Sequence, residues 1–91
     1  MISLECSVAP SQDVIWRLVD DEVFIINEDG ETIHVLNRTG GFIWELCEQE
    51  MKVADIVERV CERFEVSPEQ AEADTVDLLE QMFAKNILNR K

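Results

Sequence analysis

The middle of the chain reads Thr32-Ile33-His34-Val35-Leu36-Asn37-Arg38-Thr39-Gly40-Gly41-Phe42-Ile43-Trp44-Glu45-Leu46. This stretch predicts a short strand over residues 32–36 that runs directly into a helix, with either Asn37 or Thr39 as the capping residue. The strand is the last one before the helices, so we expect it at the edge of a small sheet. The backbone groups of an edge strand are open to pairing with a further strand.

Two more strands are predicted upstream of this stretch. Residues 14–19 are rich in β-branched and aromatic side chains and end at Asp20-Asp21, which indicates a turn. Residues 22–27 form the second strand, and Asp29-Gly30 after it is a strong hairpin signal because tight turns need positive φ. Together with residues 32–36 they predict an antiparallel meander. Residues 1–12 show few periodic signals, and we expect a loosely ordered N-terminal segment there.

The second half of the chain is helical. The first helix starts at Asn37 or Thr39 and carries an apolar face that ends near Cys47. Residues 53–64 form a second helix, because their apolar positions recur at the helical spacing i, i+3, i+4, i+7. Ser67 is the predicted N-cap of a third helix, with Pro68 at its first position and Gln70 completing a capping box. We expect it to reach about residue 85 and to end at a left-handed Asn86.

These elements predict an α+β fold in which a three-stranded antiparallel N-terminal sheet is followed by a three-helix bundle, a winged-helix-like arrangement. Neither half could bury its apolar face alone, so residues 1–91 are expected to form a single domain.

Charge and composition restrict the choice of partner. The 91 residues include 20 acidic and 8 basic side chains, for a net charge of −12. Nucleic acids and anionic membrane surfaces attract basic proteins, so neither is an expected partner. No apolar run approaches the roughly 20 residues that cross a bilayer, and the N-terminus lacks the pattern of a signal peptide. The predicted location is the cytoplasm.

The sequence contains little that suggests catalysis. Cys6, Cys47 and Cys61 are widely spaced and form no CxxC pair, and His34 is the single histidine. We interpret the cysteines as small buried hydrophobic residues rather than as metal ligands. No nucleophile–base pair or phosphate-binding loop is recognisable. We therefore predict a protein that is not an enzyme and that has no cofactor, catalytic residue or metal site.

The third helix has a broad apolar arc made of two adjacent stripes. One stripe, suited to the core, contains Val76, Leu79 and Phe83; the other contains Ala71, Thr75, Leu78 and Met82. Both stripes could be buried between sheet and bundle. Alternatively, Leu78 and Met82 form the floor of a groove whose other wall is the strand 32–36. An extended peptide could then pair with the edge strand and place alternate side chains against the helix.

The chain resembles the PqqD-like family, on motifs that run in order through the sequence. They are Val35-Leu36-Asn37-x-Thr39-Gly40-x-x-Ile43-Trp44-x-Leu46, then Val53-Ala54-Asp55-Ile56-Val57, then Phe64-x-Val66, and last Asp74-x-x-x-Leu78-Leu79-x-x-Met82. The resemblance extends from about residue 14 to residue 88. It departs from the family pattern at residues 48–52, where many members have a basic or glycine-containing turn, and at Asn86, where glycine is common.

The resemblance implies a peptide-binding adaptor that captures the leader segment of a ribosomally made precursor peptide by strand addition. It implies a second partner, a modifying enzyme of the radical S-adenosylmethionine type, in the biosynthesis of pyrroloquinoline quinone (PQQ) or a related peptide-derived product. The implied peptide-binding residues are Thr32, Ile33, His34, Val35, Leu36, Ala71, Asp74, Thr75, Leu78 and Met82. The alternatives are a structural or regulatory interaction subunit and, less favoured because the third helix is acidic, a winged-helix DNA-binding regulator.

Overall fold

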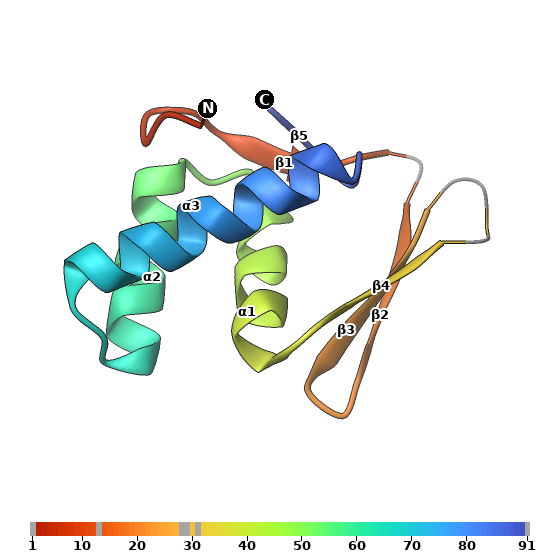
Figure 1. Ribbon diagram of the computed structural model, residues 1–91, viewed down its shortest axis with the longest axis horizontal. Helices are drawn as coiled ribbons and strands as arrows, with labels where there is room; N and C mark the ends of the chain where they lie inside the picture. Colours follow the sequence, from red (N-terminus) through yellow and green to blue (C-terminus); the bar gives the residue numbers. More distant parts are fainter. Residues whose placement is uncertain (1, 13, 28–29, 31, 91) are drawn as a thin grey trace.

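The computed structural model describes residues 2–12, 14–27, 30 and 32–90 (Figure 1). Within them the elements follow in the order β1 (Val8–Pro10), β2 (Ile15–Val19), β3 (Glu22–Ile26), β4 (Ile33–Leu36), α1 (Arg38–Cys47), α2 (Val53–Phe64), α3 (Pro68–Ala84) and β5 (Leu88–Arg90). The three predicted strands and three predicted helices are confirmed to within a residue or two at each end.

The central sheet is an antiparallel meander in the order β2-β3-β4, which places β4 at an edge as predicted. Asp20 and Asp21 both have positive φ, 50° and 68°, and form the tight turn between β2 and β3. This conformation matches the right-handed twist of a two-residue hairpin. Asp29 of the predicted Asp29-Gly30 turn lies outside the described residues. Gly30 has the positive φ that the prediction requires, +71°, and Asn27 N donates to Thr32 O across the turn.

The inner face of this sheet packs against α1. Val23 and Ile25 of β3 are fully buried, and so is Trp44 of α1, whose ring meets that of Trp16 edge-on at a centroid distance of 6.3 Å. A Cβ atom on Gly41 would lie 3.0 Å from Val23 Cγ2. The glycine therefore lets α1 approach the sheet closely.

A second sheet, absent from the sequence-based prediction, joins the two ends of the chain. β1 pairs antiparallel with β5, in the register Val8↔Arg90 to Pro10↔Leu88. For residues 2–12, which the structure describes, the expectation of a loosely ordered segment over residues 1–12 is therefore wrong. Val8 is fully buried, and backbone bonds from Val53 N to Cys6 O and from Ala54 N to Leu4 O fix the preceding residues to the start of α2. The prediction of an N-terminal sheet followed by a helical bundle is corrected accordingly. Along the chain, β1 precedes the three-stranded sheet, and β5 follows the last helix.

The helices begin and end largely where their capping residues predict. Asn37, and not Thr39, is the N-cap of α1, since its Oδ1 accepts from Gly40 N at 2.9 Å. Ser67 Oγ accepts from Gln70 N at the start of α3, while the Gln70 side chain donates forward to Asp74 Oδ1. Asn86 takes the predicted left-handed conformation, with φ 62°. Among the described residues, no helix has both the length and the apolar character needed to span a membrane.

The two apolar stripes of α3 divide differently from the prediction. The fully buried positions are Ala71, Thr75, Leu79 and Met82, whereas Val76, Leu78 and Phe83 are half-buried. Spacings of four, four and three residues keep the first set on one line along the helix. That line faces the core, so Met82 is not the floor of an open groove.

Candidate peptide-binding site

β4 offers an open sheet edge with exposed aliphatic side chains. Its pairing with β3 aligns His34 with Ile25 and Leu36 with Val23, so His34 and Leu36 share the inner face. Ile33 and Val35 alternate with them on the outer face, and each is more than half exposed.

The backbone groups of β4 also alternate in direction. Asn27 N donates to Thr32 O, which makes residues 27 and 32 a hydrogen-bonded pair. Since such pairs alternate with non-bonded ones along an antiparallel ladder, His34 and Leu36 direct their N–H and C=O groups toward β3. Ile33 and Val35 direct theirs away from the sheet. These two residues therefore supply the donors and acceptors with which an added strand would pair.

A hollow of about 400 Å³ lies beside the end of this strand. It is lined by Leu36, Asn37, Thr39, Gly40, Ile43, Asp74 and Leu78, so it spans the end of β4, the first turns of α1 and the middle of α3. The aliphatic side chains among them provide an apolar surface, with polar groups around it. Its size lies in the range of small-ligand pockets, which is enough for one or two side chains of a peptide.

Two features of the local sequence keep this hollow open. The Asn37 cap turns the chain sharply from strand to helix, which brings the first turn of α1 next to α3. Gly40 lies at that contact, where a Cβ atom would come within 3.2 Å of Leu36 Cβ and 3.5 Å of Leu78 Cδ2. A larger residue at position 40 would fill the space between the strand end and the helix.

The structure brings together only some of the predicted helix residues. Leu78, half-buried, and Asp74, exposed, both line the hollow next to β4. Ala71, Thr75 and Met82 lie in the core behind it, where each is at most 1% exposed.

Sequence reasoning missed four residues that line the hollow: Asn37, Thr39, Gly40 and Ile43. They were assigned only to helix capping and packing. The Gly40-Gly41 pair was the available signal, because two glycines in the first turn of a helix indicate a close approach by another element.

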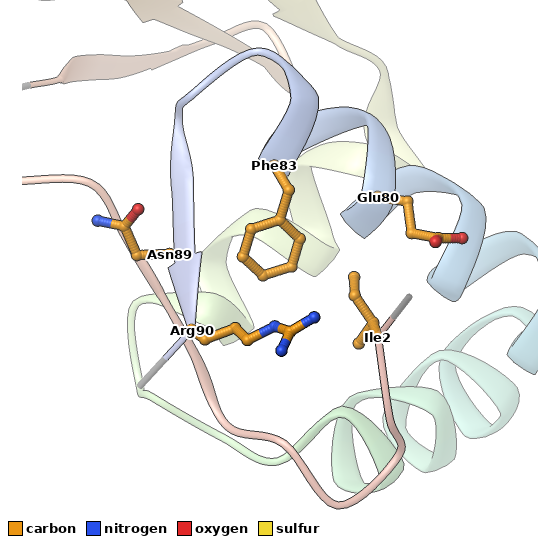
Figure 2. A pocket seen from close by; sticks show the side chains of 5 residues that line it. All are labelled: Ile2, Glu80, Phe83, Asn89 and Arg90. Carbon is orange, nitrogen blue, oxygen red and sulfur yellow. The ribbon is translucent and has the colours of Figure 1, made fainter.

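Figure 2 shows a different hollow, of about 320 Å³, at the C-terminal end of α3. The side chains of Glu80 and Phe83 from α3 lie around it with Ile2 and with Asn89 and Arg90 of β5. It contains no residue of β4, and the strand beside it, β5, has only three residues and belongs to the two-stranded sheet with β1. An extended peptide therefore has the stronger combination of ladder and pocket at β4.

The three cysteines differ in burial, since Cys47 is buried and Cys6 and Cys61 are half-buried. Cys6, Cys47 and Cys61 are free thiols, and the residues that the structure describes contain no group of three or more His, Cys, Asp or Glu side chains placed to hold a metal ion. Burial raises the pKa of Cys47 to about 12, with a smaller contribution from the negative charge of Glu48. A thiol with so high a pKa is a poor nucleophile at neutral pH.

Comparison with known proteins gives two matches and one negative result. A solved structure described as "TbiB1 in Complex with the TbiA(beta) Leader Peptide" superimposes with a TM-score of 0.83 at 28% sequence identity, covering 89% of this chain and 94% of that one. Curated protein sequences give no significant match. The sequence profile described as "Coenzyme PQQ synthesis protein D (PqqD)" matches residues 22–88, which include β3, β4, all three helices and the residues lining the hollow. The chain therefore belongs to the PqqD family.

Proposed function

We propose that this protein is a peptide-binding adaptor that captures the leader segment of a ribosomally made precursor peptide. The leader adds to β4 as a further antiparallel or parallel strand and pairs with the outward backbone groups of Ile33 and Val35. One or two of its apolar side chains enter the hollow beside Leu78. The observation that carries this proposal is the contiguity of an open sheet edge with an apolar hollow.

Membership of the PqqD family and the likeness to TbiB1, solved with a leader peptide, support the proposal. In this assignment residues 32–36, Asp74 and Leu78 contact the leader. Ala71, Thr75 and Met82 lie in the core and fix the position of α3, which forms one wall of the hollow. They influence binding only through the position of α3.

The energetics fit a reversible adaptor. Each ladder hydrogen bond contributes about 0.5–1.5 kcal/mol, largely independent of the leader sequence. An apolar anchor that is fully desolvated adds about 1.5–3 kcal/mol and gives selectivity. After the cost of ordering the peptide, the expected dissociation constant lies between micromolar and nanomolar values.

We propose further that the chain performs no chemistry itself and presents the leader to a modifying enzyme. The family assignment favours a radical S-adenosylmethionine enzyme, in a pathway to PQQ or to another peptide-derived product. Free thiols at all three cysteines suit a reducing compartment, the cytoplasm.

The test is a titration with synthetic leader segments of the precursor peptide encoded with this protein, followed by isothermal calorimetry. The proposal is supported if the leader segment binds saturably with one-to-one stoichiometry and the rest of the precursor peptide does not bind. Equal affinity for both segments, or no binding of either, contradicts it.

A further inference from the structure

The hollow beside β4 has a charged side chain in its lining. The described residues around it are Leu36, Asn37, Thr39, Gly40, Ile43, Asp74 and Leu78, and all of these except Asp74 are apolar or neutral. A peptide side chain that enters the hollow therefore meets an apolar surface and a carboxylate. The surroundings of Asp74 decide which side chain fits there beside an apolar one.

The apolar and the acidic parts of the hollow lie one helical turn apart. A Cβ atom on Gly40 would lie 3.2 Å from Leu36 Cβ and 3.5 Å from Leu78 Cδ2, which places these three residues together at an apolar end. Asp74 precedes Leu78 by four residues on α3. The two side chains therefore lie on the same side of the helix, about 6 Å apart along its axis.

An extended peptide matches this spacing with two of its side chains. In a strand added to β4, every second side chain points to the inner face, which is the face of His34 and Leu36. Two such side chains, at positions j and j+2, are about 6.6 Å apart because a strand rises about 3.3 Å per residue. β4 and α3 lie along similar directions across the view in Figure 1. With one peptide side chain against Leu78, the next one on the same face can reach Asp74.

Asp74 can bind a cation because its present partner is neutral. The side chain is exposed, and its Oδ1 accepts from Gln70 Nε2 at 2.8 Å. Among the described residues this amide is the bonded partner of Asp74, and it leaves the negative charge uncompensated. A bound peptide removes water from the carboxylate, which is unfavourable unless the peptide supplies a partner. A Lys or Arg side chain supplies one, through a charge-assisted hydrogen bond.

The nearby helix end does not reverse this preference. The N-terminus of α1 borders the hollow and carries a partial positive charge of about half an elementary charge, which attracts anions. Its cap is already filled, since Asn37 Oδ1 accepts from Gly40 N. Arg38, the first residue of α1, lines a different hollow beside the β2–β3 turn. An anionic peptide side chain would therefore lie beside the full charge of Asp74, in a protein whose net charge is −12.

We propose that the leader carries an apolar residue and a Lys or Arg two positions away from it. Asp74 binds the basic side chain while Leu78 contacts the apolar one. This inference rests on the proposed function, because the leader and its pairing with β4 come from it. It adds the chemical class of peptide that the hollow selects. Either order of the two residues fits, since the hollow fixes their spacing and not the direction of the strand.

The test uses the full chain and the synthetic leader of the precursor peptide encoded with this protein, titrated by calorimetry at low and at high salt. Asp74→Asn removes the charge and keeps the shape and the oxygen that Gln70 contacts. The matched control is Asp77→Asn. Asp77 is also exposed on α3 and accepts from Gln81 Nε2 at 2.9 Å, but it does not line the hollow. On the leader, each Lys and Arg is replaced singly by Gln.

We expect Asp74→Asn to bind the leader about fivefold more weakly, the upper range for an ion pair near the surface, and Asp77→Asn to bind within about twofold of wild type. High salt should weaken binding to wild type more than binding to Asp74→Asn. Replacing one basic leader residue, two positions from an apolar residue, should cause the same loss in wild type and no further loss in Asp74→Asn. Asp74→Lys should lose still more and regain affinity when that leader residue is Glu.

Equal leader affinity of wild type and Asp74→Asn overturns the inference while leaving leader capture intact. The same holds if no basic residue of the leader is coupled to position 74, or if the charge swap restores nothing. Failure of the leader to bind wild type overturns the proposed function and, with it, this inference. Circular dichroism checks that each variant is folded. If Asp74→Asn unfolds, the Gln replacements on the leader, measured with wild type, still decide whether a basic residue is required.

Discussion

Gly40 and Leu78 meet at the edge of the hollow, so closely that a Cβ atom on Gly40 would lie 3.5 Å from Leu78 Cδ2. Because Gly40 has no side chain, the first turn of α1 can lie next to the middle of α3 without filling the hollow. The hollow therefore opens directly beside the end of β4. Ladder and pocket form one continuous surface, which is the arrangement that an extended peptide requires.

Leu78→Ala should weaken leader binding by about tenfold or more while the protein stays folded. The substitution removes the main aliphatic contact that α3 makes with the hollow, and one buried apolar anchor contributes about 1.5–3 kcal/mol, where 1.4 kcal/mol is tenfold in affinity. Val76→Ala is the matched control, because Val76 is also half-buried on α3 but does not line the hollow. Calorimetric titration with the leader checks both. Equal losses in the two variants would place the binding surface elsewhere.

Met82→Asp should unfold the protein rather than affect binding selectively. Met82 is 1% exposed, so the substitution removes core packing worth about 2–5 kcal/mol and buries a carboxylate as well. Ala73→Asp places the same residue on the exposed side of α3 and should cost under about 1 kcal/mol. Urea denaturation followed by circular dichroism measures both. A stable Met82→Asp variant would mean that this part of α3 faces a groove after all.

Val8→Thr should destabilise the protein by about 1–3 kcal/mol, because it buries a hydroxyl group at a fully buried position of β1. Ala9→Thr, the adjacent position on the same strand, is only half-buried and should have a much smaller effect. Thermal melting distinguishes the two. If both variants melt like wild type, the N-terminal segment is not part of the core.

Cys47 should make the protein less stable at high pH. Burial raises its pKa from 9.0 to about 12 in the folded protein, so above pH 9 the thiol ionises in the unfolded chain first. Ionisation then favours the unfolded state by about 1.4 kcal/mol per pH unit between pH 9 and 12, and by nothing below pH 9. The free energy of unfolding of wild type should fall more steeply over pH 9–10.5 than that of Cys47→Ala. Parallel curves for the two proteins would contradict the buried thiol.

The central sheet was predictable because its signals are local. The β-branched and aromatic residues at 14–19 and 32–36 and the Asp20-Asp21 turn are signals between neighbours in sequence, and they predicted the strands to within a residue. Residues 2–12 carry no comparable signal, because Leu4 and Glu5 lie in a turn and β1 has only three residues. Its strand partner lies at the far end of the chain, and no local pattern identifies a pairing of three residues over that separation.

The candidate site was only partly predictable for a related reason. Periodicity places residues on a helix face but does not say which neighbour covers it. Leu79 was correctly placed in the stripe suited to the core, but Ala71, Thr75 and Met82 were placed in the other stripe although all three are buried in the core. The edge position of β4 followed from chain order alone. The contribution of α1 to the hollow could not be predicted from chain order, because it depends on how closely Gly40 approaches Leu78.

Amide hydrogen exchange measured by NMR, with and without the leader, tests the strand-addition claim most directly. Binding should slow exchange at Ile33 and Val35, whose amides point to the open edge of β4, by at least about tenfold, as hydrogen bonding to a partner strand protects them. By the same alternation, Trp16 and Leu18 direct their amides to the other edge of the sheet, along β2, and their exchange should not change. Protection at Trp16 and Leu18 instead, or at neither edge, would contradict addition of the leader to β4.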